Sequence, residues 1–503
     1  MNELVAVTVP LLQADFPWLS LLLLLLPLGA GITLLMPARE ARWTSLTTAI
    51  AAFTVSLWIV FQFDPQQSGF QFVERSPWIP SLHIEYLLGV DGLSLLLLPV
   101  TTLLFMAVII SSWNAMRFLP NLFFSLLLLF EACLIGIFSA LDTALFFLCW
   151  ELSLLPLFFL VSLWGAGPNR RHAAVKYTLF MMSGGAAILL AFIALAVQAP
   201  EGIGFDYTLL LQVVHQPNFQ YETAIFFLLL FGFALKLPTV PFHAWLPVLA
   251  QEGPASVVAT VVGLKVGVYG LIRFALPLAP SAAQDYQWLL VGMGMLSVLY
   301  GALAALSQTN LRRMLAYSSL SHVGLVVLGV ASLTHAGIQG AIFQLLNFSL
   351  IASGLFLILA FVHQRLGSTE FLNLGGIASS MPLLASLFFF FGVASIGLPL
   401  TSGFPAEFLL IMGIAETHLG AGLLSLAAMI ITAAYFLSSY RQSFLGAVRH
   451  AAVAQSVDLK PRELAALWLL GVPILVWGFY PQGLLSILQT SSTDWLSHIL
   501  MQQ

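Results

Sequence analysis

Ionisable side chains stand inside long apolar runs of this chain, where a charge is costly to bury and usually serves a function. Lys236 follows the uncharged run 224–235, and Lys265 lies near the middle of another. Because lysine, glutamate and histidine can gain and lose protons, this pattern predicts proton transfer through the interior. The principal candidates are Glu151, Lys236, Lys265, His322 and Glu407, with Glu131 and Lys176 as secondary ones.

The basic residues inside these apolar runs are all lysines, although the chain has only four lysines and thirteen arginines. Arginine stays charged in proteins, whereas a buried lysine can lose its proton, so the choice of lysine favours titration. Lys176 differs, because it stands beside Arg170 and Arg171 near the start of its run and could extend to the membrane surface. An unpaired buried carboxylate costs several kcal/mol, so we expect the buried lysines and glutamates to pair.

His322 lies within another apolar run, in the segment Ser318–Gly324. Histidine changes charge near neutral pH and is a natural relay between lysines and glutamates. A single membrane histidine can also be a hydrogen-bonded structural group, and His243, beside a cluster of prolines, could equally cap a loop. The lysines and glutamates in the other apolar runs favour the relay at His322.

Two apolar runs are interrupted in a similar way, each next to a candidate residue. After Lys236 the chain has three prolines between residues 238 and 247, which remove amide donors and break a helix. The second interruption contains Gly397-Leu-Pro399 before Glu407, and the two Leu-Pro pairs are 161 positions apart. Interrupted helices at corresponding places indicate an internal repeat with a transport path between its halves. Because an odd number of spans separates the copies, the two would be inverted.

Membrane helices must hold these residues. Of 503 residues, 60% are apolar and 8% are charged, whereas an ordinary soluble domain is about 25% charged. The mean hydropathy is +0.99. This balance excludes soluble enzymes, nucleic-acid binders with a basic face, and disordered chains. The two cysteines lack metal-ligand spacing, so we expect no cofactor or metal on this chain.

At about 20 residues per crossing, the sequence predicts an all-α polytopic membrane protein with about fourteen spans and two broken helices. The spans are expected near 21–35, 43–63, 92–111, 120–140, 143–164, 174–198, 223–246, 254–276, 287–306, 312–333, 336–363, 381–413, 418–441 and 463–483.

The basic residues orient these spans. Twelve of the 17 follow odd-numbered spans, which places them in the cytoplasm or stroma by the positive-inside rule. Only Arg75, in the long loop 64–90, and Arg273 fall on the other side. Both termini are therefore expected on the non-cytoplasmic side. The twelve are Arg39, Arg42, Arg117, Arg170, Arg171, Arg312, Arg313, Arg365, Arg441, Arg449, Lys460 and Arg462.

Together these residues resemble the antiporter-like membrane subunits of respiratory and photosynthetic complex I, specifically chain 4 of NAD(P)H-quinone oxidoreductase. The likeness covers nearly the whole chain and is strongest from 85 to 445. The marks that carry it are Glu131…Trp150-Glu151…Pro156, Lys236-x-Pro238-x-x-Pro241-x-His243-x-Trp245-Leu-Pro247, Lys265-x-Gly267-x-Tyr269, Arg312-Arg313…Ser321-His322-x-Gly324 and Gly397-x-Pro399…Gly403-Phe-x-x-Glu407.

The resemblance implies fourteen helices with inverted five-helix repeats at 120–276 (spans 4–8) and 287–445 (spans 9–13). A three-helix region (1–119) would precede them, and a basic loop, last helix and tail (446–503) would follow. It also implies that Glu151 pairs with Lys236. Protons would pass along a central axis through Lys265 and His322 to Glu407.

The resemblance places the redox reaction on partner subunits, which would hold NAD(P)H or ferredoxin, iron–sulfur clusters and quinone. The implied partners are chains 2 and 5, small membrane subunits and lipid, with no nucleic acid. The implied membrane is a bacterial inner membrane or a cyanobacterial thylakoid.

Three positions depart from the pattern of this family. Relatives usually carry aspartate and histidine where this chain has Val248 and Ala250, and many carry histidine near Asn347. Asparagine can hydrogen-bond water but cannot titrate, so the axis would be connected differently here. Such divergence would suit a cyanobacterial paralogue in a complex specialised for CO2 uptake, with CO2-uptake subunits as partners.

Two other functions compete with proton translocation. Sodium/proton antiporter subunits of the Mrp type share nearly all of these marks. A membrane scaffold that transports nothing is the third hypothesis.

Overall fold

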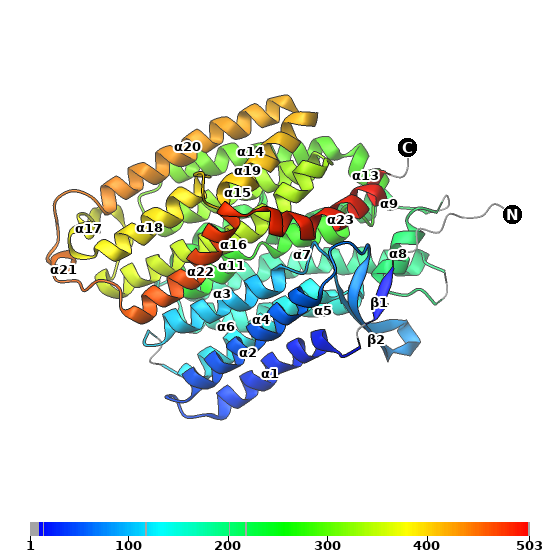
Figure 1. Ribbon diagram of the computed structural model, residues 1–503, viewed down its shortest axis with the longest axis horizontal. Coiled ribbons are helices and arrows are strands. Elements are labelled where there is room, and N and C mark those ends of the chain that lie inside the picture. The colour runs from blue at the N-terminus through cyan, green and yellow to red at the C-terminus, as the bar shows by residue number, and fades with distance from the viewer. Residues whose placement is uncertain (1–9, 14, 116–117, 201, 217–218, 501–503) are drawn as a thin grey trace.

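The computed structural model describes residues 10–500 apart from 14, 116–117, 201 and 217–218, so Arg117 lies outside the described residues. Most of the helices run along the long axis of the molecule (Figure 1). Short elements gather at its two ends, with α17 (Ile377–Ser380) and α21 (Ala451–Ala454) at one end. At the other end lie α8 (Tyr207–Val213) and α13 (Pro280–Asp285).

Eleven helical stretches among the described residues are at least 18 residues long and apolar enough to cross a membrane. The chain is therefore an integral multi-pass membrane protein, as predicted. The stretches are α1 (Trp18–Leu35), α2 (Ala41–Gln62), α4 (Pro120–Ser139), α5 with α6 (Thr143–Leu152, Leu154–Trp164), α7 (Arg170–Gln198), α11 with α12 and η3 (Ala255–Gly263, Val266–Gly270, Leu271–Ala275), α14 (Gln287–Leu306), α15 (Leu311–Ala331), α16 (His335–Leu366), α20 (Leu419–Ser443) and α22 (Pro461–Phe479).

The centre of the bundle is formed by α11, α15 and α16, which are almost entirely buried. The outer helices expose large apolar side chains, among them Leu28 and Leu35 of α1 and Phe61 of α2. Apolar residues on both faces of a helix are what a membrane span requires, because lipid and protein core are equally apolar. The candidate proton carriers Lys265, just after the end of α11, and His322, on α15, thus lie away from lipid.

Shorter helices occupy three of the fourteen predicted spans. The predicted span 92–111 holds α3 (Leu97–Ser112), which is 16 residues long. The predicted span 223–246 holds α9 (Glu222–Lys236) and η2 (Phe242–Trp245), followed by α10 (Leu246–Glu252). The predicted span 381–413 holds α18 (Pro382–Ser395) and α19 (Gly403–Thr417). α9 and α18 end shortly before Pro238 and Pro399, as predicted, because proline lacks the amide donor that would continue a helix.

A third helix is interrupted, where the sequence predicted a continuous span. Lys265 stands between α11 and α12 with φ −84° and ψ 62°. The Val266 amide donates to the Leu264 carbonyl at 3.0 Å, so the Val262 carbonyl loses its helical partner. Gly267 lets this interruption pack against the one that follows Lys236. A Cβ at position 267 would stand only 2.6 Å from the Leu237 amide nitrogen. The prediction of two broken helices was therefore incomplete.

Residues 64–90, predicted as a loop, contain most of a small sheet of order β1–β2–β3, which corrects the loop prediction and adds a minor element to the helical fold. β1 (Leu11–Gln13) runs parallel to β2 (Phe70–Ile79), which is antiparallel to β3 (Ile84–Val90). The charged residues of this segment suggested a loop, but in the hairpin they find partners. Glu74 accepts hydrogen bonds from the Leu19 and Ser20 amides at the start of α1. Arg75 Nε lies 2.6 Å from Glu85 Oε2 across the hairpin.

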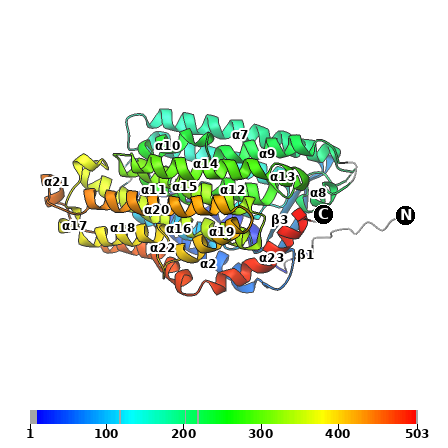
Figure 2. The ribbon, with the colours of Figure 1, turned by 90° about the horizontal axis from the view of Figure 1, so that it is seen from above.

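The segment after α22, predicted as a tail, forms the 19-residue helix α23 (Gln482–Leu500). Leu488, Trp495 and Ile499 are buried along one face, while Thr493 and Asp494 lie on more exposed sides. This pattern anchors the helix to the bundle. Figure 2 shows α23 at the same end of the molecule as β1 and β3.

Candidate functional site

Lys236 ends α9 at the first interruption. Its Nζ donates a hydrogen bond to Ser153 Oγ at 3.2 Å and lies 3.8 Å from the centroid of the Trp150 ring, where the ring electrons attract a cation. The expected ion pair between Glu151 and Lys236 is not formed among the described residues. Glu151 points at Gly185 of α7 instead. The reason is helical spacing, because Trp150 and Ser153, three positions apart, share a face that Glu151 does not.

Lys265 is buried at the third interruption, with 6% of its surface exposed. Its Nζ donates to the carbonyl of Val262, which the helix break has freed, and to Ser319 Oγ of α15. The Nζ also lies 5.3 Å from the centroid of the Phe348 ring of α16. The break therefore supplies part of the polar site that holds this lysine.

His322 and Glu407 meet at the second interruption. His322 Nε2 lies 3.7 Å from Glu407 Oε1 and 3.0 Å from the carbonyl oxygen of Ser395, the last residue of α18. The other ring nitrogen, Nδ1, lies 2.8 Å from the Ser318 carbonyl. Both carbonyls are acceptors, and a neutral imidazole has one N–H. The ring can therefore satisfy both carbonyls only when it carries a second proton.

A chain of amides and a hydroxyl extends from Glu407. Gln344 Nε2 donates to Glu407 Oε1 at 3.3 Å, and Asn347 Nδ2 donates to Gln344 Oε1 at 2.9 Å. Ser402, in the second interruption, donates its hydroxyl to Asn347 Oδ1. Asn347, noted as a departure from the family pattern, is thus a buried link between the interruption and Glu407.

Two small cavities lie beside the candidate residues. One of about 20 Å³ is lined by His322, Ser395, Glu407 and Thr432, among others. Another of about 20 Å³ is lined by Lys236, Trp245, Thr260 and Val266, among others. A cavity needs about 10–15 Å³ to hold a water molecule, so each has room for one.

The ring of Phe348 lies between Lys265 and His322. Its ring centroid is 4.4 Å from that of His322 and 5.3 Å from Lys265 Nζ. Lys265, His322 and Glu407 thus follow one another across the core, while Lys236 stands at the neighbouring break. We call these four residues the polar axis.

The secondary candidates are not joined to the polar axis. Glu131 of α4 is fully buried, and neither carboxylate oxygen has a hydrogen-bond partner among the described residues. The expectation that every buried glutamate is paired is therefore wrong for Glu131. Lys176 lies half-buried in the second turn of α7.

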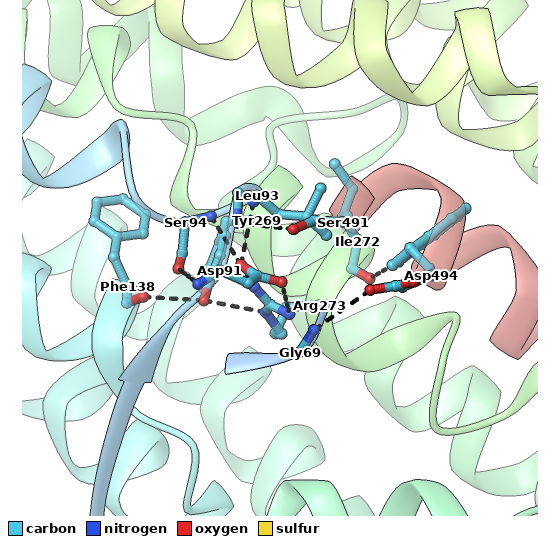
Figure 3. Close-up of polar contacts among 12 residues, drawn as sticks. Gly69, Asp91, Leu93, Ser94, Phe138, Tyr269, Ile272, Arg273, Ser491 and Asp494 are labelled. Atoms are coloured by element: carbon cyan, nitrogen blue, oxygen red, sulfur yellow. Dashed lines mark hydrogen bonds and ion pairs between the residues drawn. The ribbon is translucent and has the colours of Figure 1, made fainter. Parts of the chain in front are cut away.

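A buried cluster that sequence reasoning missed lies at the end of the molecule that holds the sheet (Figure 3). The sequence placed Arg273 on the non-cytoplasmic side, apart from the lysines of the membrane interior, but only 3% of its surface is exposed. Its Nη1 donates to Asp91 Oδ2 at 2.8 Å and its Nη2 to Asp91 Oδ1, and its Nε donates to the Tyr269 hydroxyl at 3.3 Å. The correction has a physical reason, because Asp91 neutralises the charge with a two-point contact.

This cluster borders a cavity of about 210 Å³ between the sheet, η3 and α23. Trp495 Nε1 donates to the Ile272 carbonyl at 2.7 Å, and Gly69 donates its amide to Asp494 at 3.4 Å. Burial raises the pKa of Asp494 above its ordinary value. Asp91 and Arg273 are 182 positions apart, and only their opposite charges at the ends of apolar runs could have suggested the pair.

Comparison with known protein families identifies the family of this chain. The transmembrane family described as NADH:quinone oxidoreductase/Mrp antiporter matches residues 140–432, which contain the whole polar axis. NAD(P)H-quinone oxidoreductase chain 4 1 of Synechococcus elongatus is 36% identical over 95% of this chain and 91% of the relative. The chain belongs to this family.

The structural comparison supports the same branch of the family. A chain of the solved structure titled respiratory complex I from Thermus thermophilus with bound NADH has a TM-score of 0.86 and 29% identity, over 95% of this chain and 99% of that one. A chain of the Mrp complex from Dietzia has a TM-score of 0.80 at 22% identity, which shows the fold alone. The predicted chain 4 assignment is confirmed. This family member is a proton-translocating membrane subunit of a complex I-like quinone oxidoreductase.

Proposed function

We propose that protons cross the interior of this subunit along the polar axis of Lys236, Lys265, His322 and Glu407, driven by redox chemistry in other subunits. The observation that carries the proposal is the contact of His322 with Glu407 at the second interruption. Non-helical backbone at membrane depth is tolerated only inside protein or beside a water-filled path. All three interruptions border residues of this axis.

His322 can act as the relay by a change of hydrogen bonds. A neutral ring leaves one of its two carbonyl contacts unsatisfied, whereas a protonated ring satisfies both and gains the attraction of Glu407. A proton that arrives from the Lys265 side is thereby stabilised next to its acceptor. The cavity at Glu407 provides room for a water that carries the proton onward.

Lys236 can act as a switch in the first half of the subunit. Its present partners, Ser153 and Trp150, carry no formal charge. The carboxylate of Glu151 belongs to the residue that follows Trp150 on α5. The pairing of Lys236 with Glu151 would form when the side chains rearrange. A charge-assisted pair that forms and breaks changes the proton affinity of the lysine, which is the step that a pump must control.

We further propose that the chain crosses the membrane fourteen times and contains two inverted repeats, 120–276 and 287–445. The eleven long stretches and the three shorter ones together supply fourteen crossings. A structural signature supports the repeat: Asp142 and Asp206 form an isolated antiparallel bridge, and so do Asn310 and Glu370. Each bridge joins the link after the first helix of a repeat to the link after the third. Asp142 caps α5 and Asn310 caps α15, at equivalent places five spans apart.

Protons fit this axis better than sodium ions. A sodium ion needs several oxygen ligands, whereas the axis contains two lysines, which repel a cation and can carry a proton. The proposed membrane partners are chains 2 and 5 and small subunits. Partner subunits of the assembly would hold NAD(P)H or ferredoxin, iron–sulfur clusters and quinone. The proposed membrane is a bacterial inner or thylakoid membrane, with both termini on the non-cytoplasmic side. A CO2-uptake complex stays a prediction.

Glu407→Gln is expected to reduce proton pumping by about 100-fold, because a positioned proton carrier contributes about 10²–10⁴-fold to rate. The amide keeps the size of the side chain and removes its titration. The measurement is proton uptake into liposomes that contain the whole assembly, compared with its rate of quinone reduction. Glu416→Gln is the matched control, because Glu416 lies on the same helix and is exposed. Unchanged pumping in Glu407→Gln would favour the scaffold hypothesis.

Asn347→Leu tests separately whether the hydrogen-bonded chain from Ser402 through Asn347 and Gln344 contributes to pumping. The substitution removes a donor to Gln344 and an acceptor from Ser402, and each buried polar group left unsatisfied costs about 1–3 kcal/mol. We expect a lower midpoint of thermal unfolding and a smaller loss of pumping than in Glu407→Gln, because asparagine does not titrate. A loss as large as that of Glu407→Gln would show that the amide chain itself carries the proton path.

A further inference from the structure

A polar groove of about 780 Å³ opens at the end of the bundle opposite the sheet. It lies between the end of α3, the end of α16, the link that contains α21 and the start of α22. Arg365, Lys460 and Arg462 line it, together with a single acid, Glu463. That acid is already engaged, because it accepts from Arg365 and from the Lys460 backbone amide. The groove therefore carries an excess of positive charge.

Two arginines beside this groove have unsatisfied donors. The Nε atoms of Arg42 and Arg462 are buried and have no hydrogen-bond partner among the described residues. Arg42 reaches the groove through Asn114, which lines it and accepts from Arg42 Nη1 at 3.4 Å. Arg42 contacts Asn114 and Arg462 lies over the ring of Trp113, so the two like charges flank neighbouring residues of one turn. Because both Nε atoms are buried, an anion would meet the outer nitrogens of the two guanidinium groups and offset their like charges.

The helix ends increase the positive potential. Arg42 is the second residue of α2 and Arg462 is the second residue of α22. The first turn of a helix presents free amide groups and the positive end of the helix dipole, so a cation there is unfavourable without an anion. In α22 the acid Glu463 already stands in this first turn, whereas the first turn of α2 holds no acid, so an added anion would be stabilised chiefly beside Arg42.

Tryptophans place this site at the level of lipid headgroups. Trp113 lies beneath Arg462, whose Cζ is 5.9 Å from the ring centroid. Trp43, 59% exposed, packs edge-on against Trp113 at 4.9 Å. Tryptophan is enriched at the membrane–water boundary, where its ring meets acyl chains and its N–H meets water. The neighbouring outer helices α1 and α2 are apolar, so acyl chains can lie alongside.

We propose that this groove binds the phosphate of an anionic phospholipid from the leaflet on the basic side of the membrane. Arg42 and Arg462 donate hydrogen bonds to the phosphate, and Lys460 contacts the headgroup. Trp43 and Trp113 contact the start of the acyl chains. Basic pockets between membrane helices on this side are suited to anionic headgroups. A zwitterionic lipid is bound less well, because its own cation would meet the positive groove.

The test uses the purified whole assembly, stripped of lipid in detergent and titrated with dioleoyl-phosphatidylglycerol. Native mass spectrometry counts the lipids retained. We expect the double variant Arg42→Gln/Arg462→Gln to bind one lipid fewer, with an affinity about 100-fold lower at that site. The matched control is Arg441→Gln/Arg449→Gln, which removes two exposed arginines on the same side of the membrane. The variant Arg42→Lys/Arg462→Lys should recover part of the binding, which separates lost charge from lost folding.

Three outcomes would overturn the proposal. Equal retention by the double variant and the wild type would show that the arginines do not hold the lipid. Equal retention of dioleoyl-phosphatidylcholine would show that the site does not select an anion. Displacement of the lipid by inorganic phosphate at low concentration would show a site for free phosphate instead.

Discussion

Lys236→Ala is expected to reduce proton pumping by about 100-fold, because it removes a titratable group at the centre of the first half of the subunit. Lys236 stands at an interruption, contacts Ser153 and Trp150, and lines a cavity with room for one water. The measurement is proton uptake by liposomes containing the whole assembly, driven by its quinone reductase activity.

Two further variants separate titration from structure. Lys236→Arg keeps a cation over Trp150 but cannot release its proton, so we expect pumping to be lost although assembly persists. Lys176→Ala is the control, because this half-buried lysine near the start of α7 is not joined to the polar axis. If Lys176→Ala were as damaging as Lys236→Ala, or if Lys236→Arg pumped normally, Lys236 would not be the switch.

Arg273→Ala is expected to destabilise the subunit by about 3–5 kcal/mol, which is the cost of leaving a buried charge without its partner. Asp91 would lose its two-point contact in a site where 6% of its surface is exposed. The effect should extend to the sheet, η3 and α23, which border the same cavity (Figure 3). The measurement is the midpoint of thermal unfolding of the purified assembly and the amount of subunit incorporated.

A surface ion pair at the same end of the molecule supplies the comparison. Arg75 contacts Glu85, with 39% and 27% of the two side chains exposed, and its Nη2 also lies 3.2 Å from the buried Asp206. Glu85→Ala removes only the outer partner and should therefore cost about 0–1 kcal/mol. The variant Asp91→Asn/Arg273→Gln removes both buried charges and should recover much of the stability lost in Arg273→Ala. If Arg273→Ala were no worse than Glu85→Ala, the buried pair would contribute little.

The amino-acid sequence determined the membrane character, the position of most helices and the location of two interruptions. These features depend on local composition: long apolar runs form spans, and prolines end helices wherever the chain folds. The titratable candidates were also evident, because a charge inside an apolar run stands out against 8% charged residues. The sheet of residues 64–90 was missed, since its charged side chains mimic a loop.

Only the tertiary structure decided which groups meet. Lys236 contacts Ser153 and Trp150 instead of Glu151, and Arg273 is buried against Asp91, a pairing that the sequence did not predict. The reason is that helices in lipid are apolar all round, so the sequence carries little information about which face of a helix points to a neighbour. The contacts that define the polar axis are therefore set by the packing of helices far apart in the chain, which local patterns cannot encode.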